Sequence, residues 1–246
     1  MKVSVITAVY NSRATIGDAL DSVRRQAGVD IDHVVIDGAS TDGTTQLLEA
    51  RRHEFAVFLS ERDRGIYDAL NKGIARATGD VVGFLHADDV FAADDTLLQV
   101  ARAFADPAVD AVYGDCEYVR ADAPQSVVRH WRAGEFTPRR LAWGWMPPHP
   151  TLYVRRGWYE RLGTYDTRYR IAADYHFVLR LFSQAGLRVA YVPRVLVRMR
   201  VGGVSNRSLA NLVRKSREDY DALRRCGVGG VGALAWKNLS KLGQFL

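Results

Sequence analysis

The sequence predicts an α/β protein whose core is a mostly parallel β-sheet with helices on both faces. Over about the first ninety residues, short apolar runs rich in β-branched residues alternate with amphipathic segments, as in repeated strand–helix units. The runs are apolar throughout, as in strands that are covered on both faces. With 246 residues and 48% hydrophobic content, the chain is long enough to bury one large core.

The first half of the chain supplies this alternation. The run KVSVITAVY (2–10) fits a buried strand, and the segment after it places Ile16, Ala19, Leu20 and Val23 at helical spacing. The next predicted elements are a strand in 32–40, a turn and helix in 41–54, a strand in 56–63, a helix in 65–78 and a strand in 80–88. This order favours parallel strands, which bind ligands beyond their carboxyl ends.

Beyond about Asp106 the pattern changes. A predicted strand in 108–119 is followed by residues 128–156, which are rich in Trp, Arg and Pro, and whose five aromatic residues argue against disorder. A helix in 172–186 and a strand in 188–200 complete the predicted core. We expect one domain over 1–205, with halves at 1–105 and 106–205, and a helical tail over 206–246.

The predicted tail holds much of the positive charge of the chain, whose net charge is +6. Its basic residues are Arg207, Arg214, Lys215, Arg217, Arg224, Arg225, Lys237 and Lys241, against Glu218, Asp219 and Asp221. Such asymmetry suggests an anionic partner: nucleic acid, a phosphorylated substrate or a membrane surface. Packing of the tail against the core or against a second subunit is the alternative.

The two cysteines, Cys116 and Cys226, lie far apart and indicate neither a disulfide framework nor a zinc site. The N-terminal run is too short in apolar residues for a signal peptide, and no long uncharged run suggests a membrane span. The expected location is therefore the cytoplasm.

Three polar clusters follow predicted strands on the same side of the sheet, at 7–11, 37–44 and 86–89. Together they describe one crevice. In the third cluster, Asp88 and Asp89 are adjacent and would point to opposite faces of a strand, so both can serve one site only if the chain has turned. Two carboxylates suit Mg²⁺ or Mn²⁺, which complete their shell with phosphates and water. The alternative is a helix cap.

The loop after the first strand, TAVYNSRA, has neither spacing of a glycine-rich phosphate loop. A nicotinamide enzyme and a P-loop NTPase are thus disfavoured. Neutralising a diphosphate would depend on a metal ion and on Arg or Lys side chains.

With these residues identified, the chain resembles glycosyltransferase family 2, the inverting nucleotide-sugar transferases of the GT-A fold, and among them the bacterial enzymes of exopolysaccharide and lipopolysaccharide assembly. The resemblance covers roughly residues 2–205. Its marks, in order, are VSVITAVYN, VVIDGASTDGT, SERDRGIYDALNKGIARATGD, GFLHADD, PHPTLYVRR and RIAADYHFVLRL.

The resemblance implies a nucleotide-sugar site built from the N-terminal half. The residues it assigns to the donor are Thr7, Ala8, Tyr10, Asn11, Asp37, Ser40, Asp63, Asp68, Asn71, His86, Asp88, His149 and Arg200. Asp89 is the implied ligand of Mg²⁺ or Mn²⁺, in a DxD-type element where His86 replaces a common acidic residue.

Some of these assignments leave alternatives open. Tyr10 fits core packing as well as stacking on a base, and Asp68 fits a surface-helix ion pair. His149 is as readily a structural histidine. Arg198 is as well placed in the sequence as Arg200.

Inverting transfer needs one general base to deprotonate the acceptor hydroxyl. The family supplies a carboxylate at the start of a late helix, and Asp174 matches that position, although Ala173 precedes it where relatives often carry Glu or Gly. The alternative for Asp174 is a carboxylate that interacts with the helix dipole. In that case Asp115 is the next candidate base.

The expected function is metal-dependent, inverting transfer of a hexose from a nucleotide-diphosphate sugar, with UDP-sugars favoured. The acceptor is a glycan or a lipid-linked glycan. The expected partners include an anionic membrane surface at 207–246 and a second copy of the chain, but no nucleic acid. The rivals are a sugar-phosphate nucleotidyltransferase, for which the first loop lacks glycines, and a nucleic-acid-binding module, which leaves the acidic strand ends unexplained.

Overall fold

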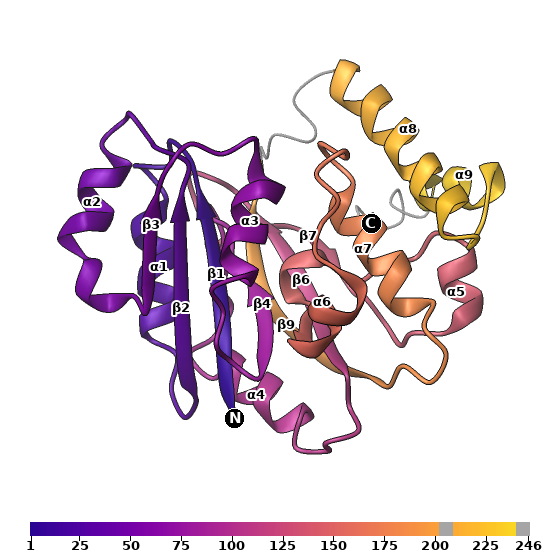
Figure 1. Cartoon of the computed structure of the whole chain (residues 1–246), viewed down its shortest axis with the longest axis horizontal. Coiled ribbons are helices and arrows are strands. Elements are labelled where there is room, and N and C mark those ends of the chain that lie inside the picture. Colours follow the sequence, from indigo (N-terminus) through magenta and orange to yellow (C-terminus); the bar gives the residue numbers. More distant parts are fainter. Residues whose placement is uncertain (202–208, 240–246) are drawn as a thin grey trace.

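A computed structural model describes residues 1–201 and 209–239 as an α/β protein with a single mixed sheet between layers of helices (Figure 1). The strand order is β3-β2-β1-β4-β8-β6-β9-β5, and β7 pairs with β6. The predicted α/β class is therefore confirmed.

The first half of the sheet is parallel, as predicted. Its strands are β1 (Lys2–Val9), β2 (Asp30–Asp37), β3 (Val57–Ser60) and β4 (Val81–Phe84). The segments between them are α1 (Ile16–Arg24), α2 (Thr44–Ala50), the short 3-10 helix η1 (Arg52–Glu54) and α3 (Ile66–Ile74).

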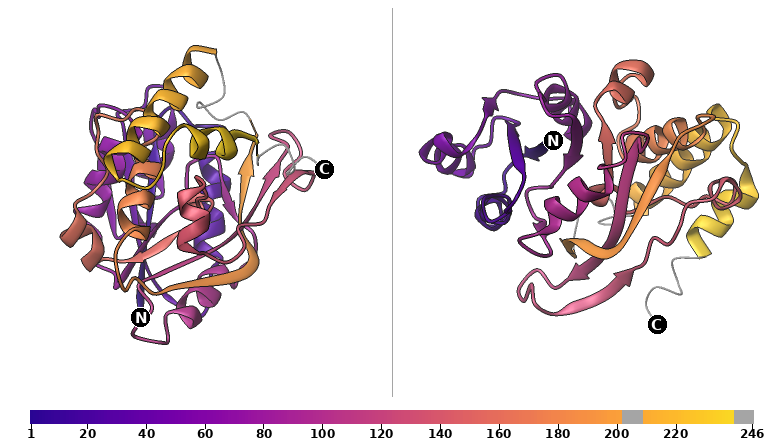
Figure 2. Two further views of the ribbon diagram at one scale, coloured as in Figure 1. Left: turned by 90° about the vertical axis from the view of Figure 1, so that its right-hand side faces the viewer. Right: turned by 90° about the horizontal axis from the view of Figure 1, so that it is seen from below.

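The second half of the sheet mixes parallel and antiparallel pairs. Its strands are β5 (Val90–Phe91), β6 (Ala111–Val119), β7 (Val127–Trp131), β8 (Tyr153–Arg155) and β9 (Val189–Arg200). β8 runs antiparallel to both β4 and β6, so it joins the two halves. Figure 2 shows how far the long strands of this half curve. The Trp- and Arg-rich stretch is ordered and contains β7 and α5 (Pro138–Ala142).

Two apolar clusters, one on each face of the sheet, make up the core. One contains Leu70 of α3 and Phe177 of α7 (Ala173–Phe182), and the other contains Leu20 of α1 and Leu97 of α4 (Thr96–Ala103). The remaining short helices are η2 (His149–Thr151) and α6 (Gly157–Leu162). Helices on both faces explain why the strands carry apolar runs without alternation.

The C-terminal helices α8 (Leu209–Arg225) and α9 (Val231–Leu239) pack beside α7 instead of extending from the rest of the chain (Figure 1). Ala222, Leu223 and Ala233 are buried in the same cluster as α7. Gly144 (φ 80°) permits the close approach of α9, since a Cβ there would lie 2.7 Å from the carbonyl oxygen of Ala233. Core packing, one of the alternatives for the tail, therefore accounts for its described part.

Two of the basic residues assigned to the tail, Arg207 and Lys241, lie outside the described residues. Within 1–201 and 209–239, no helix combines the length and apolar character that crossing a membrane requires.

Candidate active site

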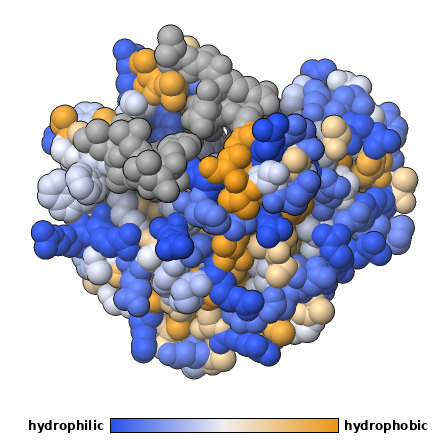
Figure 3. All heavy atoms as spheres, turned by 180° about the vertical axis from the view of Figure 1, so that it is seen from behind, coloured by the Kyte–Doolittle hydropathy of each residue, from blue (hydrophilic) through white to orange (hydrophobic). Residues whose placement is uncertain are grey.

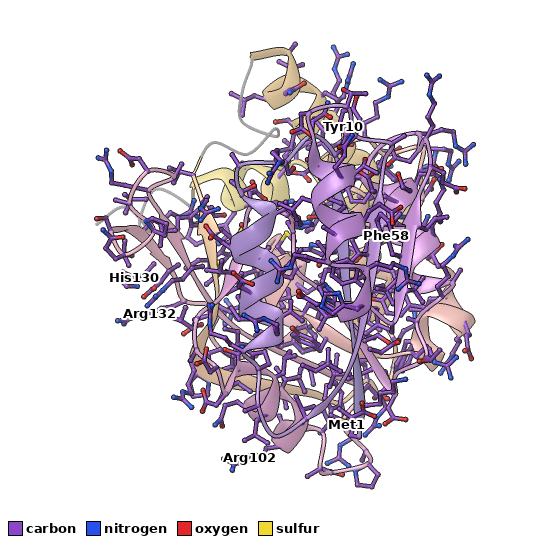
Figure 4. All side chains as sticks on the ribbon, turned by 90° about the vertical axis from the view of Figure 1, so that its left-hand side faces the viewer. Met1, Tyr10, Phe58, Arg102, His130 and Arg132 are labelled. Atoms are coloured by element: carbon purple, nitrogen blue, oxygen red, sulfur yellow. The ribbon has the colours of Figure 1, made fainter. Side chains whose placement is uncertain are left out.

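The three polar clusters predicted from the sequence meet at one edge of the sheet. Val9 pairs with Asp37, and Ile6 pairs with Phe84, so the loops after β1, β2 and β4 leave the sheet side by side. Figure 4 shows Tyr10 at this end of the molecule and Met1 at the opposite end. The predicted crevice therefore exists as an arrangement of strand ends.

The fully buried carboxylate of Asp37 organises the loop after β2. It accepts hydrogen bonds from the hydroxyls of Ser40 (2.5 Å), Ser60 (2.6 Å) and Thr45 (2.7 Å). Three hydroxyl donors occupy both of its oxygens, so a direct hydrogen bond from a nucleotide has to share or displace one of them.

Asn11 joins the loops after β1 and β2. Its side-chain oxygen accepts from the amide of Thr41 (2.8 Å), and its own amide donates to the Ser40 hydroxyl (2.8 Å). Its φ of 48° lies in the left-handed region, which Asn tolerates better than most residues. Asn11 and Ser40 thus fix the shape of the crevice wall.

Tyr10, Gly38 and Asp63 come together at the entrance of this wall. A Cβ on Gly38 would lie 2.6 Å from Asp63 Oδ2 and 3.2 Å from the Tyr10 ring. Tyr10 is 62% exposed, which excludes core packing as its role. An exposed aromatic ring beside a carboxylate has the elements of a nucleobase site.

Thr7 and Ala8, predicted beside the base, are buried in β1. The Thr7 hydroxyl lies 3.0 Å from His33 Nε2, so it is not available to a ligand. That part of the prediction is wrong for the Thr7 side chain, because β1 is buried on both faces.

Asp68 and Asn71 of α3 also have partners within the chain. Asp68 pairs with Arg64 (3.2 Å) and Lys72 (3.8 Å), which matches the surface ion-pair alternative. Asn71 exchanges two hydrogen bonds with the backbone of Tyr165 (2.8 and 2.9 Å). Asn71 therefore holds α3 against the loop before α7, and the polar groups of both Asp68 and Asn71 have partners within the chain.

The chain turns between His86 and Asp89, as two adjacent carboxylates in one site require. The amide of Asp89 donates to the carbonyl of His86 (3.0 Å), which closes the turn. Asp88 is half-buried and Asp89 is 2% exposed. Burial, together with the charge of Asp88, raises the pKa of Asp89 well above its usual range, although Arg200 opposes the shift.

Asp88 and Asp89 fit a divalent cation. Among the described residues, Asp89 Oδ2 is buried without a hydrogen-bond partner, and a cation would supply the missing partner for this oxygen. No group of three or more His, Cys, Asp or Glu side chains gathers in the described ranges 1–201 and 209–239. A site of one or two carboxylates completed by substrate phosphates is the usual pattern for Mg²⁺.

Arg200, at the end of β9, is the arginine beside Asp89. Its side chain is 8% exposed and pairs with Asp18 of α1, while its Nε and Nη1 have no partner within the described part of the chain. Arg198 instead pairs with Glu117 (3.0 Å). Of the two arginines, Arg200 is thus the one beside Asp89 with nitrogens that lack a partner in the described residues, and its role toward the donor stays a prediction.

His86 and His149 form the floor of the site. Their rings stack with centroids 5.7 Å apart, and His149 Nε2 lies 2.8 Å from the Tyr165 hydroxyl. Burial, with the neighbouring His86, lowers the pKa of His149 to about 4, although Asp174 opposes the shift. His149 is therefore neutral at pH 7 and can contribute hydrogen bonds but no charge.

Asp174 lies in the first turn of α7, directed at the same centre. The Tyr67 hydroxyl of α3 lies 3.1 Å from Asp174 Oδ1 and 2.6 Å from the carbonyl oxygen of Ile171. The charge of Asp174 acts on both His86 and His149. Asp115, the fallback base, instead accepts from Ala133 (2.8 Å) and Tyr191 (2.8 Å).

Sequence reasoning missed three residues around Asp174: Tyr67, Tyr165 and Glu218. Tyr67 and Tyr165 lie in or near segments that resemble the family, but a tyrosine in a helix or loop carries no distinctive spacing. Glu218 lies in the tail, where the excess of basic residues indicated an anionic partner and no pattern marked a single glutamate.

Comparison with known proteins identifies the class to which this fold and site belong. The sequence model described as Glycosyl transferase family 2 matches residues 4–183, and the chain belongs to this family. A PGL/p-HBAD biosynthesis glycosyltransferase of Mycobacterium tuberculosis is 35% identical over 212 residues, which span 82% of this chain and 78% of that protein. An uncharacterised glycosyltransferase of the same species is 34% identical over 72% of this chain and 68% of its own length.

Solved structures agree on the GT-A fold. Staphylococcus aureus TarS 1–349 in complex with UDP-GlcNAc has a TM-score of 0.70 at 19% identity, over 93% of this chain and 66% of that one. The chain spans 39% of the longer TarS structure. The mannosyltransferase PcManGT from Pyrobaculum calidifontis, in complex with GDP-Man and Mn²⁺, has a TM-score of 0.67 at 24% identity, over 98% and 74% of the two chains. The nucleotidyltransferase and nucleic-acid alternatives find no support here.

Proposed function

We propose that this glycosyltransferase moves a hexose from a nucleotide-diphosphate sugar to an acceptor hydroxyl with inversion at the anomeric carbon. The observation that carries the proposal is the convergence of the late-helix carboxylate Asp174 and the strand-end carboxylates on one centre. The charges of Asp88 and Asp174 both act on the half-buried His86. One group of carboxylates can thus serve the diphosphate while another serves the acceptor.

The donor side divides between two groups of residues. Tyr10 and Asp63 take the nucleobase at the exposed entrance, on the wall shaped by Asn11, Asp37 and Ser40. Asp89, assisted by Asp88, would hold Mg²⁺ or Mn²⁺, which neutralises charge on the diphosphate. Arg200, whose backbone amide bonds Asp89, has two guanidinium nitrogens without a partner in the described part of the chain, and these are suited to phosphate oxygens.

Asp174 acts as the general base on the acceptor. Its carboxylate is half-buried, and the backbone amide of Tyr175 (2.8 Å) and the nearby Tyr67 hydroxyl (3.1 Å) orient its Oδ1. As the acceptor oxygen attacks the anomeric carbon, Asp174 accepts its proton, and the bond to the diphosphate breaks on the opposite face. A neutral His149 in the floor adds no positive charge that would compete for this carboxylate.

The donor and acceptor classes follow from the relatives by analogy. TarS was solved with UDP and with UDP-GlcNAc, and PcManGT with GDP-Man. We favour a UDP-sugar as donor and a glycan or lipid-linked glycan of the cell surface as acceptor. The name of the 35% identical mycobacterial relative places that protein in PGL/p-HBAD biosynthesis.

A panel of UDP- and GDP-sugars tests the function through release of the nucleoside diphosphate. Release is expected with Mg²⁺ or Mn²⁺ and is expected to stop in EDTA, and NMR of the product reports the anomeric configuration. A product that retains the donor configuration would overturn the inverting mechanism. Full turnover in chelator would overturn the metal requirement.

We also propose that the outer surface of α8 and α9 contacts an anionic membrane from the cytoplasmic side. Leu212, Val213 and Val231 are exposed there and line an open groove of about 480 Å³. Arg217 lies in the same groove, and the exposed Arg214 is its neighbour on α8. Apolar side chains with cationic flanks are the composition of an interfacial surface.

A further inference from the structure

Helix α7, which carries Asp174, begins without a cap of its own. The residue at its N-cap position is Ala172, which has no side-chain acceptor for the amides of the first turn. The first amides of a helix have no partner within the helix, and alanine is among the poorest N-cap residues. Within the first turn, the Asp174 carboxylate accepts from the amide of Tyr175 (2.8 Å), and the segment that precedes the helix is held from elsewhere in the chain.

Glu218, in the middle of α8, binds the backbone that leads into this N-terminus. Its carboxylate accepts hydrogen bonds from three consecutive backbone amides, those of Arg170 (3.1 Å), Ile171 (2.8 Å) and Ala172 (3.0 Å). Between 46 and 48 residues of chain separate donor and acceptor. A carboxylate at a helix N-terminus also interacts favourably with the helix dipole.

Tyr67 holds the same segment from the other side. The peptide groups of Ile171 are bound at both ends, the amide by Glu218 (2.8 Å) and the carbonyl by the Tyr67 hydroxyl (2.6 Å). The same hydroxyl lies 3.1 Å from Asp174. The backbone that leads into Asp174 is therefore clamped between α3 and α8.

We propose that Glu218 is a positioning residue for sugar transfer, which fixes the start of α7 so that the Asp174 carboxylate meets the acceptor hydroxyl. This inference rests on the proposed role of Asp174 as the base. It assigns the C-terminal helices a part in the reaction. A base displaced by about 1 Å can lose about 100-fold in rate, so the orientation of this short segment matters.

Docking of α8 on the core does not depend on Glu218 alone. Asp219 is buried between Lys215 (3.0 Å) and Lys237 (2.8 Å), and Asp221 accepts from the Tyr169 hydroxyl (2.5 Å). Asp221 is therefore a matched control. It lies one turn from Glu218 on the same helix and contacts the same loop, but it bonds none of the amides at 170–172.

The test compares Glu218→Ala and Glu218→Gln with Asp221→Asn. Glu218→Ala is expected to lower kcat by about 10- to 100-fold while the donor KM stays within about twofold. Glu218→Gln should recover part of the rate, since its amide oxygen still accepts from the backbone. Asp221→Asn should lower the thermal midpoint by a similar amount and leave kcat within about twofold. A kcat for Glu218→Ala equal to that of Asp221→Asn would overturn the proposal.

Hydrogen exchange at the amides of 170–172 supplies a readout that needs no substrate. Exchange should accelerate in Glu218→Ala and stay unchanged in Asp221→Asn. Unchanged exchange in Glu218→Ala would show that Glu218 does not hold these amides, even if sugar transfer is established. The wild-type chain could instead fail to transfer any sugar of the donor panel while exchange accelerates in Glu218→Ala as expected. That result would disprove the proposed function but leave the hydrogen bonds of Glu218 to residues 170–172 established.

Discussion

Asp89 is a residue whose contributions to stability and to activity have opposite signs. Burial of the Asp89 carboxylate is destabilising, because Arg200 compensates only in part for the lost solvation and Oδ2 has no hydrogen-bond partner among the described residues. Such a group persists where a ligand or a cation compensates for it. Asp89 Oδ2 therefore destabilises the metal-free protein, and it is also the atom that we expect to bind the cation.

Asp89→Asn is expected to abolish detectable transfer and to keep or raise the thermal midpoint. The amide is neutral and nearly isosteric, so burial costs less, while its affinity for a divalent cation is lost. Calorimetric titration with UDP and Mn²⁺ should show donor binding that no longer depends on the metal. Metal-dependent binding of wild-type strength in this variant would rule out Asp89 as the ligand.

Asp174→Asn separates chemistry from binding. A base acts on the acceptor proton only as the transition state forms, so kcat and kcat/KM should fall together, by about 10²–10⁴-fold, with the donor Kd nearly unchanged. If Asp174 only interacted with the helix dipole, the substitution would cost about 1 kcal/mol of stability and little rate. Asp115→Asn is the control, because Asp115 is held by Ala133 and Tyr191. An active, destabilised Asp174→Asn enzyme would remove the assignment.

At the scale of elements, β2 carries a buried histidine that couples folding to pH. Burial is the main reason that the pKa of His33 falls to about 4, with Arg51 lowering it further and Glu54 and Asp32 opposing the shift. The neutral ring bonds Thr7 of β1. Below about pH 6.5 this histidine is protonated in the unfolded chain but stays neutral in the folded chain. The free energy of unfolding therefore falls as the pH decreases toward 4.

His33→Gln is expected to make the acid loss of stability shallower. Between about pH 6.5 and 4, the wild-type free energy of unfolding should fall by up to about 1.4 kcal/mol per pH unit more than that of the variant. Above pH 6.5 the two slopes should agree. Urea titrations at half-unit intervals measure the difference. Parallel curves throughout would show that His33 titrates alike in the folded and unfolded chains.

Local patterns in the sequence were sufficient to predict the elements of the parallel half and the crevice at their ends. The turn at Asp88 and Asp89 followed from strand geometry alone, and the structure has it. The burial of Thr7 could not be predicted from the sequence. A strand that is covered on both faces shows no alternation of polar and apolar residues, so the pattern does not tell which side chains reach the crevice. The N-terminus of α7 shows a further limit, since the backbone that leads into it is held by Glu218 of another helix.

At the scale of the whole molecule, the chain places its two kinds of carboxylate on separate structural units. The carboxylates proposed for the donor extend from the parallel half, whose strands β1, β2 and β4 end together, while Asp174, the proposed base, comes from α7 in the second half. β8 joins the two halves by pairing with β4 and with β6. The boundary at residue 205 stays a prediction, and the tail beyond it contributes Glu218 to the start of α7.

The tail has a second, outward surface. Figure 3 views the molecule from behind, where apolar atoms lie among hydrophilic ones on the upper left, the side of the C-terminal helices. Val213 and Trp236 are each 53% exposed, and Val231 is 69% exposed. Exposed apolar side chains in this number, with arginines between them, are unusual for a helix that only covers a core.

The last prediction is that the full chain binds anionic vesicles through this surface. Each arginine near the surface contributes about 1 kcal/mol, so Arg214→Gln should weaken sedimentation with phosphatidylglycerol vesicles about fivefold, and raised salt should weaken the wild type. Val213→Ser should weaken it as well, by removing apolar area from the lipid boundary. Val128→Ser on β7, a 46% exposed valine outside the tail, is the control and should bind like the wild type. Equal binding of Val213→Ser and Val128→Ser would exclude the tail surface. A concentration-dependent dimer that Val213→Ser dissociates would show instead that a second copy of the chain covers it.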